Sequence, residues 1–167
     1  TWLSAVADAR VRAIAPLVID VLDMQTQMDY HYQAYNGYSS AVHDYVDFNV
    51  FDRFDTERGQ ELLAIVDPYS YLWALDMPKL LINSTGDQFF LPDSAQFYVH
   101  ELPGETRLRY LPNTDHGVEQ GSSLQDLAAS LFSFYAAVAN DLPLPSFTWE
   151  VTDDNEIQVQ TEPAFPP

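Results

Sequence analysis

The stretch from Met77 to Gly117 decides the fold. It begins Met-Pro-Lys-Leu-Leu-Ile-Asn-Ser-Thr-Gly-Asp-Gln-Phe-Phe-Leu-Pro-Asp-Ser (77–94) and ends Thr-Arg-Leu-Arg-Tyr-Leu-Pro-Asn-Thr-Asp-His-Gly (106–117). Two apolar runs, 79–83 and 106–111, have the length and composition of strands. The residues between them predict a helix. Strand, helix and strand in this order predict a parallel βαβ unit.

Each of the two runs is followed by a loop that carries one chemically useful residue. Asp87 follows the first run and His116 follows the second. Ligands and catalytic groups of open α/β sheets gather beyond the carboxyl ends of the strands. An acid followed by a histidine is the second half of a Ser…Asp…His order, in which the acid orients the imidazole and the other ring nitrogen takes the proton of the serine. Asp87 and His116 are therefore the candidate catalytic pair.

Other acids compete with Asp87 for this role. Asp20 is the strongest rival, because it follows the apolar run 11–20 and could reach the histidine from a neighbouring strand end. Asp23 lies close behind it. Asp115 is adjacent to His116, and side chains of adjacent residues seldom face each other. Asp93 is better explained as the cap of a helix, with Gln96 three residues on.

Neither a metal nor a cofactor is expected. His31 and His43 lie among Asp29, Asp44 and Asp47, but their spacing matches no metal-binding signature, and a polar helix face explains them better. The six glycines form no phosphate-binding loop.

Composition narrows the class of protein. The 167 residues hold seven Lys and Arg against 25 Asp and Glu, a net charge of −18, so binding to nucleic acid is not expected. Apolar residues make up 47% of the chain, yet no apolar run is long enough to cross a bilayer. The absence of cysteine excludes disulfides. Two explanations of the large negative net charge stay open. One is a well-solvated acidic surface, and the other is a saline habitat, in which salt screens the repulsion between charges.

The segment from about 22 to 76 differs from its surroundings. It is too long for a structureless connection, and it predicts three helices: one through Met24 and Tyr35 that ends at Asn36-Gly37, one capped by Ser39 or Ser40, and one from Thr56 to about Val66. Seven of the ten tyrosines lie between Tyr30 and Tyr71. We interpret this segment as a helical cap inserted before the strand that delivers Asp87.

The remaining elements follow from local patterns. Residues 1–8 predict the end of a helix, 11–20 a strand, and 93–103 a helix that ends at Pro103-Gly104. A sustained apolar stripe from Leu124 to Val138 predicts a long helix. The boundary between the α/β part, 1–140, and a C-terminal β-region, 141–167, is placed at the linker Leu142-Pro143-Leu144-Pro145, and strict alternation on both sides of 153–155 predicts a hairpin there.

These motifs resemble one known family. Residues 78–94 and 108–117 are similar to segments typical of the PhoPQ-activated pathogenicity-related proteins, as are Thr1-Trp2-Leu3 and residues 11–22 at the start and the hairpin 145–159 at the end. The resemblance implies an α/β-hydrolase-like fold with Asp87 as triad acid and His116 as triad base. It also implies a nucleophile elbow just upstream of Thr1, and a periplasmic or secreted parent protein.

The sequence thus predicts an α/β fold: the C-terminal portion of an α/β-hydrolase, with a helical cap and the start of a C-terminal β-region. The expected parent is a serine hydrolase that cleaves an ester or amide in a small-molecule or peptide substrate. Residues 1–167 alone are expected to be inactive, since none of their serines lies on an elbow. The alternative is a secreted binding or signalling protein that keeps the hydrolase scaffold without its chemistry. The substrate and the oligomeric state stay open.

Overall fold

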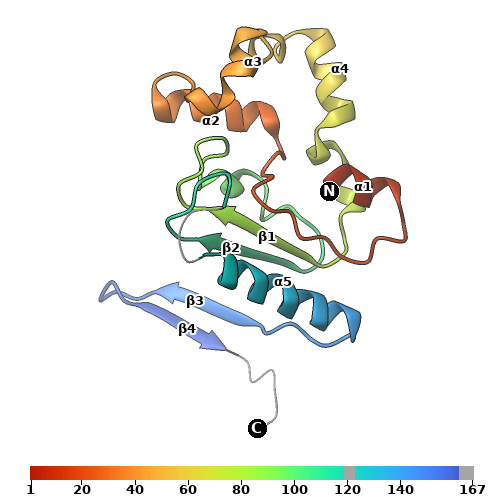
Figure 1. Cartoon of the computed structure of the whole chain (residues 1–167), viewed down its shortest axis with the longest axis vertical. Coiled ribbons are helices and arrows are strands. Elements are labelled where there is room, and N and C mark those ends of the chain that lie inside the picture. Colours follow the sequence, from red (N-terminus) through yellow and green to blue (C-terminus); the bar gives the residue numbers. More distant parts are fainter. Residues whose placement is uncertain (119–122, 162–167) are drawn as a thin grey trace. The chain divides into compact units, whose positions relative to one another are not determined.

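A computed structural model describes residues 1–118 and 123–161. The chain forms two compact units, residues 1–129 and 130–167, and each is described by itself. The fold mixes helices and strands, as an α/β class predicts (Figure 1). Residues 162–167, the last of the predicted C-terminal β-region, lie outside the described part.

The first unit contains most of the elements. In chain order they are α1 (Trp2–Ala7), α2 (Met24–Tyr35), the 3-10 turn η1 (Ser40–Val42), α3 (His43–Asp47), η2 (Phe51–Arg53), α4 (Glu57–Val66), η3 (Pro68–Ala74), β1 (Lys79–Ser84), η4 (Ser94–Phe97) and β2 (Thr106–Leu111). The helix α5 (Ser123–Ala139) crosses the boundary between the units, and the strands β3 (Phe147–Val151) and β4 (Ile157–Thr161) belong to the second.

The strands β1 and β2 pair in parallel, which confirms the pairing predicted from the sequence. The register runs from Lys79 opposite Thr106 to Ser84 opposite Leu111, so both strands end at the same edge (Figure 1). Every residue of β1 is buried. Parallel strands that are covered on both faces read as continuous apolar runs, which explains why this strand was visible in the sequence.

The prediction of a continuous strand over residues 11–20 is wrong. Ile14 and Leu17 each form an isolated parallel bridge to β1, opposite Lys79 and Ile82. Pro16 lies between these bridges and has no N–H to donate, and Val18 has a positive φ of 46°. The segment therefore runs beside β1 and reaches Asp20 without forming a regular ladder.

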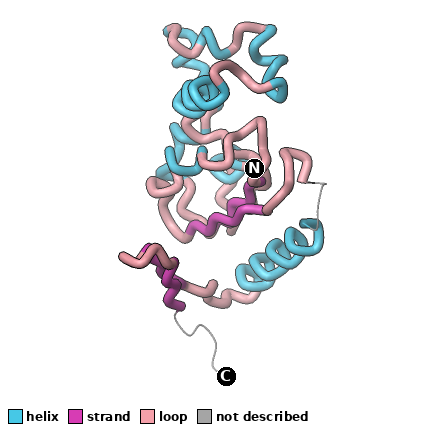
Figure 2. Tube along the Cα trace, turned by 90° about the vertical axis from the view of Figure 1, so that its left-hand side faces the viewer, coloured by secondary structure: helices cyan, strands magenta, loops and turns pink. Residues whose placement is uncertain are grey.

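The helical segment 22–76 largely follows its prediction, and Figure 2 shows its helices gathered together and joined by loops. The helix α2 ends at Asn36 in the left-handed region, and Thr56 caps α4 by accepting a hydrogen bond from the Gly59 nitrogen at 3.1 Å. The second predicted helix is shorter and split, because η1 precedes α3 and Ser39 makes no side-chain cap.

The helix predicted over 93–103 is also wrong. Only the single turn η4 forms, and Asp93 makes no side-chain cap. The Asp93 carboxylate instead accepts a hydrogen bond of 2.5 Å from the Tyr30 hydroxyl, 63 residues away. A long-range partner has replaced the local cap.

The core of the first unit joins distant parts of the chain. It holds Trp2, Ala5, Ile14, Leu22, Leu75, Leu81, Ala95, Tyr98 and Leu102. Lys79, the only lysine, is also fully buried, and its Nζ donates to the carbonyl oxygens of Leu75, Met77 and Pro103 at 2.6–2.8 Å. Burial lowers the pKa of Lys79 to about 8, with the charge of Asp76 opposing the shift.

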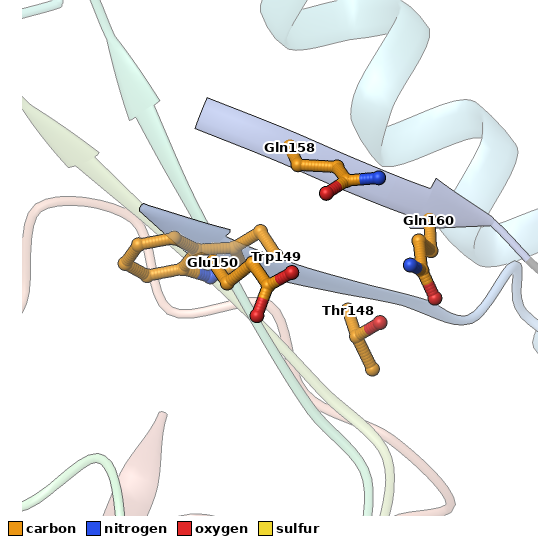
Figure 3. A pocket seen from close by; sticks show the side chains of 5 residues that line it. All are labelled: Thr148, Trp149, Glu150, Gln158 and Gln160. Atoms are coloured by element: carbon orange, nitrogen blue, oxygen red, sulfur yellow. The ribbon is translucent and has the colours of Figure 1, made fainter. Parts of the chain in front are cut away.

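The second unit contains the predicted hairpin. The strands β3 and β4 are antiparallel, with Trp149 opposite Val159 and Glu150 opposite Gln158. Alternation places Thr148, Glu150, Gln158 and Gln160 on one face of this ribbon, where with Trp149 they line a shallow hollow of about 140 Å³ (Figure 3). All ten strand residues are exposed.

Candidate active site

The structure brings His116 and Asp87 together at the carboxyl edge of β1 and β2. The Nδ1 atom of His116 lies 3.0 Å from the Oδ2 atom of Asp87. The acid is buried, with 3% of its side chain exposed, whereas the imidazole is 42% exposed. A histidine that transfers protons needs a buried carboxylate bonded to one ring nitrogen and a second ring nitrogen that a substrate can reach.

Backbone groups hold the acid in place. The other carboxylate oxygen of Asp87, Oδ1, accepts hydrogen bonds from the nitrogens of Phe89 at 2.7 Å and Phe90 at 3.1 Å. Both oxygens therefore have partners, and the carboxylate has little freedom to rotate.

The two loops that carry the pair are joined to each other. The Gly86 nitrogen donates to the Thr114 carbonyl at 2.9 Å, and the Asn113 nitrogen donates to the Thr85 hydroxyl at 2.9 Å. A Cβ on Gly86 would lie 2.8 Å from the Thr114 oxygen, closer than real side chains approach. Glycine is thus required here for the close approach of the two loops, and that approach sets the distance between Asp87 and His116.

Aromatic rings surround the histidine. Phe89 stacks on the His116 ring, with 5.0 Å between centroids and 23° between planes, and Phe90 lies 5.9 Å away at 51°. Tyr45 of α3 meets Phe89 edge to face at 5.9 Å. The imidazole is therefore fixed by packing as well as by its bond to Asp87.

The helical segment 22–76 contacts the loop that carries the acid. The Ser39 hydroxyl donates to the Gln88 carbonyl at 2.6 Å, and Tyr30 bonds to Asp93 and packs edge to face on Phe97 at 5.1 Å. These contacts involve both α2 and the loop that follows it. The segment thus contacts the loop that carries Asp87 and the turn that follows it.

The rival acids have other partners. Asp20 is buried and accepts hydrogen bonds from the Tyr98 hydroxyl and from the Asn83 amide, the latter at 3.3 Å. Burial, with the charge of Asp87, raises the pKa of Asp20 to about 7. Asp115 accepts from the Gly117 nitrogen at 3.0 Å. Among the described residues, the carboxylate that bonds to the His116 ring is that of Asp87.

Sequence reasoning missed three side chains of this region: Tyr98, Phe89 and Phe90. Tyr98 has no local pattern that connects it with Asp20, which lies 78 residues away. Phe89 and Phe90 come two and three residues after Asp87; Phe90 is buried, whereas Phe89 is only half-buried. The position of two aromatic residues two and three places after a candidate acid was the available signal.

The two histidines of the helical segment have partners other than Asp87. His31 is buried, and its Nε2 accepts a hydrogen bond from the Ser39 nitrogen at 3.1 Å; burial lowers its pKa. His43 is exposed beside Asp44. Within residues 1–118 and 123–161, no three His, Asp or Glu side chains form a group that could hold a metal ion. In the same residues, no helix is long and apolar enough to span a membrane.

Comparisons with known proteins identify the family. The model of the PhoPQ-activated pathogenicity-related protein family matches residues 1–165. The autocrine proliferation repressor protein A of Dictyostelium discoideum is 37% identical over 163 residues, which cover 96% of this chain and 33% of that protein. The chain therefore spans about a third of the length of this relative.

Proposed function

Because the chain belongs to the PhoPQ-activated pathogenicity-related protein family, we propose that it supplies the acid and the histidine of a serine hydrolase. The supporting observation is the 3.0 Å contact between His116 Nδ1 and the buried, backbone-anchored carboxylate of Asp87. In this proposal residues 1–140 form the C-terminal part of an α/β-hydrolase domain, and residues 22–76 are its cap. The family resemblance supports a periplasmic or secreted location.

The proposed reaction is acyl transfer. Asp87 keeps the proton on Nδ1 of His116, so that Nε2 can accept the proton of a serine hydroxyl as the serine attacks an ester or amide carbonyl. The same nitrogen then gives this proton to the leaving group, and water completes the cycle. The serine would come from a segment upstream of Thr1. No cofactor takes part in this scheme, and the substrate is a small molecule or a peptide.

The test uses a protein that includes the upstream serine. Hydrolysis of p-nitrophenyl acetate by the wild type should fall about 10³–10⁴-fold in kcat for Asp87→Asn, with a loss at least as large for His116→Ala. His100→Ala is the matched control, because His100 is an exposed histidine outside the site. Circular dichroism and urea unfolding show whether each variant is folded.

Two results would contradict the proposal. One is a folded His116→Ala variant that keeps wild-type kcat. The other is hydrolysis by residues 1–167 alone that is lost in His116→Ala, because the proposed serine is not in that chain.

A second candidate function is favoured by the name of the relative. That protein is called an autocrine repressor of proliferation, which suggests a secreted signalling or binding protein that keeps the scaffold without the chemistry. The two candidates differ in the serine. If the full protein does not react with a fluorophosphonate probe, the second candidate is preferred and Asp87 and His116 have only a structural role.

A further inference from the structure

A hollow on the helical segment has no role in the proposed reaction. Its volume is about 330 Å³, and its lining residues are Asp29, Tyr32, Gln33 and Tyr38. Asp29, Tyr32 and Gln33 are three and four residues apart on α2, and this spacing places them on one face of the helix. One wall of the hollow is therefore a helix face.

The opposite wall is formed by a turn. After α2, Asn36 has a φ of 51° and Gly37 a φ of 150°, and the Gly37 nitrogen bonds to the Tyr32 carbonyl at 2.9 Å. This reversal brings Tyr38 back against Tyr32, edge to face, with 5.1 Å between ring centroids. The hollow thus has two tyrosine rings, with an angle of 67° between their planes, and a carboxylate beside them.

The charge around the hollow is negative. Residues 22–76 hold ten Asp and Glu against two arginines. The pKa of Tyr38 is raised. Burial is the main cause, and the negative charges of Asp29 and Asp52 add to it. Asp29 is itself exposed, so its carboxylate can meet a ligand without first losing a partner inside the protein core.

We propose that this hollow binds an organic cation, an ammonium or guanidinium group. The faces of tyrosine rings attract such cations, and a carboxylate at the rim adds a direct charge contact. An anion would be repelled, and a neutral apolar group would gain nothing from Asp29. A hard metal ion is a poor fit, since it prefers six or more oxygen ligands in a closed shell, and the four side chains of the hollow offer one carboxylate, one amide and two neutral hydroxyls.

The hollow lies at one end of a series of ring contacts. Tyr38 packs on Phe51 at 4.8 Å, Phe51 stacks on Tyr45 at 5.6 Å, and Tyr45 contacts Phe89, which lies on His116. A cation bound in the hollow against Tyr38 would therefore touch the same aromatic cluster that packs on the candidate histidine. The proposal itself does not depend on catalysis, and its test uses binding alone.

The test compares two probes of the same shape on the 167-residue chain. Choline carries a quaternary ammonium group, and 3,3-dimethylbutan-1-ol is its neutral isostere. Titration at constant ionic strength, followed by the NMR signals of the Tyr32 and Tyr38 rings, should give saturable binding of choline. The neutral isostere should bind at least about tenfold more weakly.

Matched variants separate this site from the acidic surface in general. Asp29→Asn should weaken choline binding at least about fivefold, whereas Asp47→Asn, which removes one charge from an exposed position outside the hollow, should change it less than about twofold. Tyr32→Leu keeps apolar volume and loses the ring, and should also weaken binding about fivefold. Urea unfolding checks that each variant is folded.

Three outcomes would overturn the proposal. Choline could fail to saturate, the isostere could bind as tightly as choline, or Asp29→Asn and Asp47→Asn could weaken binding equally. The last result would mean that the cation is attracted only by the net charge.

Discussion

Asp67 accepts, on its carboxylate Oδ2, a hydrogen bond of 2.8 Å from the backbone nitrogen of Met24, 43 residues earlier in the chain. Its Oδ1 accepts from the nitrogens of Asp23 at 3.2 Å and Tyr69 at 2.9 Å. One buried carboxylate thus joins the start of α2 to the start of η3. It therefore connects the two ends of the helical segment, where the chain enters this segment from the rest of the first unit and returns to it.

Replacing this carboxylate should loosen the helical segment. Asp67→Ala leaves three backbone N–H groups without their acceptor, and the free energy of unfolding should fall by about 2–4 kcal/mol. Asp67→Asn keeps one side-chain oxygen and should lose about half as much. Urea unfolding measures both, with Asp47→Ala as an exposed control that should stay within about 0.5 kcal/mol. Equal stability of Asp67→Ala and this control would disprove the connecting role.

A second prediction concerns pH and the buried Asp20. Its folded-state pKa of about 7 lies above the ordinary value of 3.8, mainly because burial disfavours the charge. Between these values the unfolded chain has released the proton while the folded chain keeps it. The contribution of Asp20 to stability is therefore largest below pH 4 and is lost as the pH rises towards 7.

The measurement compares the wild type with Asp20→Asn at pH 5 and pH 8. The difference in unfolding free energy should move in favour of the variant by about 2–3 kcal/mol over this range. Asp47→Asn should show the same difference from the wild type at both pH values. A constant difference for Asp20→Asn would mean that its carboxyl is ionised throughout the range.

A third prediction concerns the contact between the two loops of the candidate site. Gly86→Ala would place a Cβ 2.8 Å from the Thr114 oxygen and push the loops apart. If the proposed hydrolase is correct, kcat/KM should fall about 10–100-fold, because a misplacement of a catalytic pair by about 1 Å is enough for such a loss. Gly37→Ala, which meets no atom within 4 Å, should affect stability and leave kcat/KM unchanged. Equal activity of the two variants would count against the loop contact.

The pairing of Asp87 with His116 could be predicted from the sequence, because it depends on the order of the strands along the chain and on their parallel topology. Two apolar runs of strand length joined by a connection of this length predict parallel neighbours, and parallel neighbours bring the loops after them to one edge. The helix ends at Asn36 and Thr56 could equally be predicted, since a left-handed C-cap and a hydroxyl N-cap are local signals.

Features that depend on residues distant in the chain could not be predicted from the sequence. Asp93 has the sequence of a cap, yet Tyr30 takes its carboxylate, and Ser39 donates to Gln88 instead of capping a helix. The run 11–20 has strand composition, but the missing donor of Pro16 interrupts it. In each case a tertiary contact or a single lost hydrogen bond outweighs a local preference that differs from its alternatives by about 1 kcal/mol.

Because Lys79 is buried, chemical labelling of its amine can be used to measure unfolding of the chain. No other lysine occurs in these 167 residues, and the three backbone carbonyls that enclose its amine leave an acylating reagent no approach in the native state. Covalent labelling of this side chain therefore records openings of the core around β1, and the yield of one labelled peptide measures how often the sheet at the base of the candidate site comes apart.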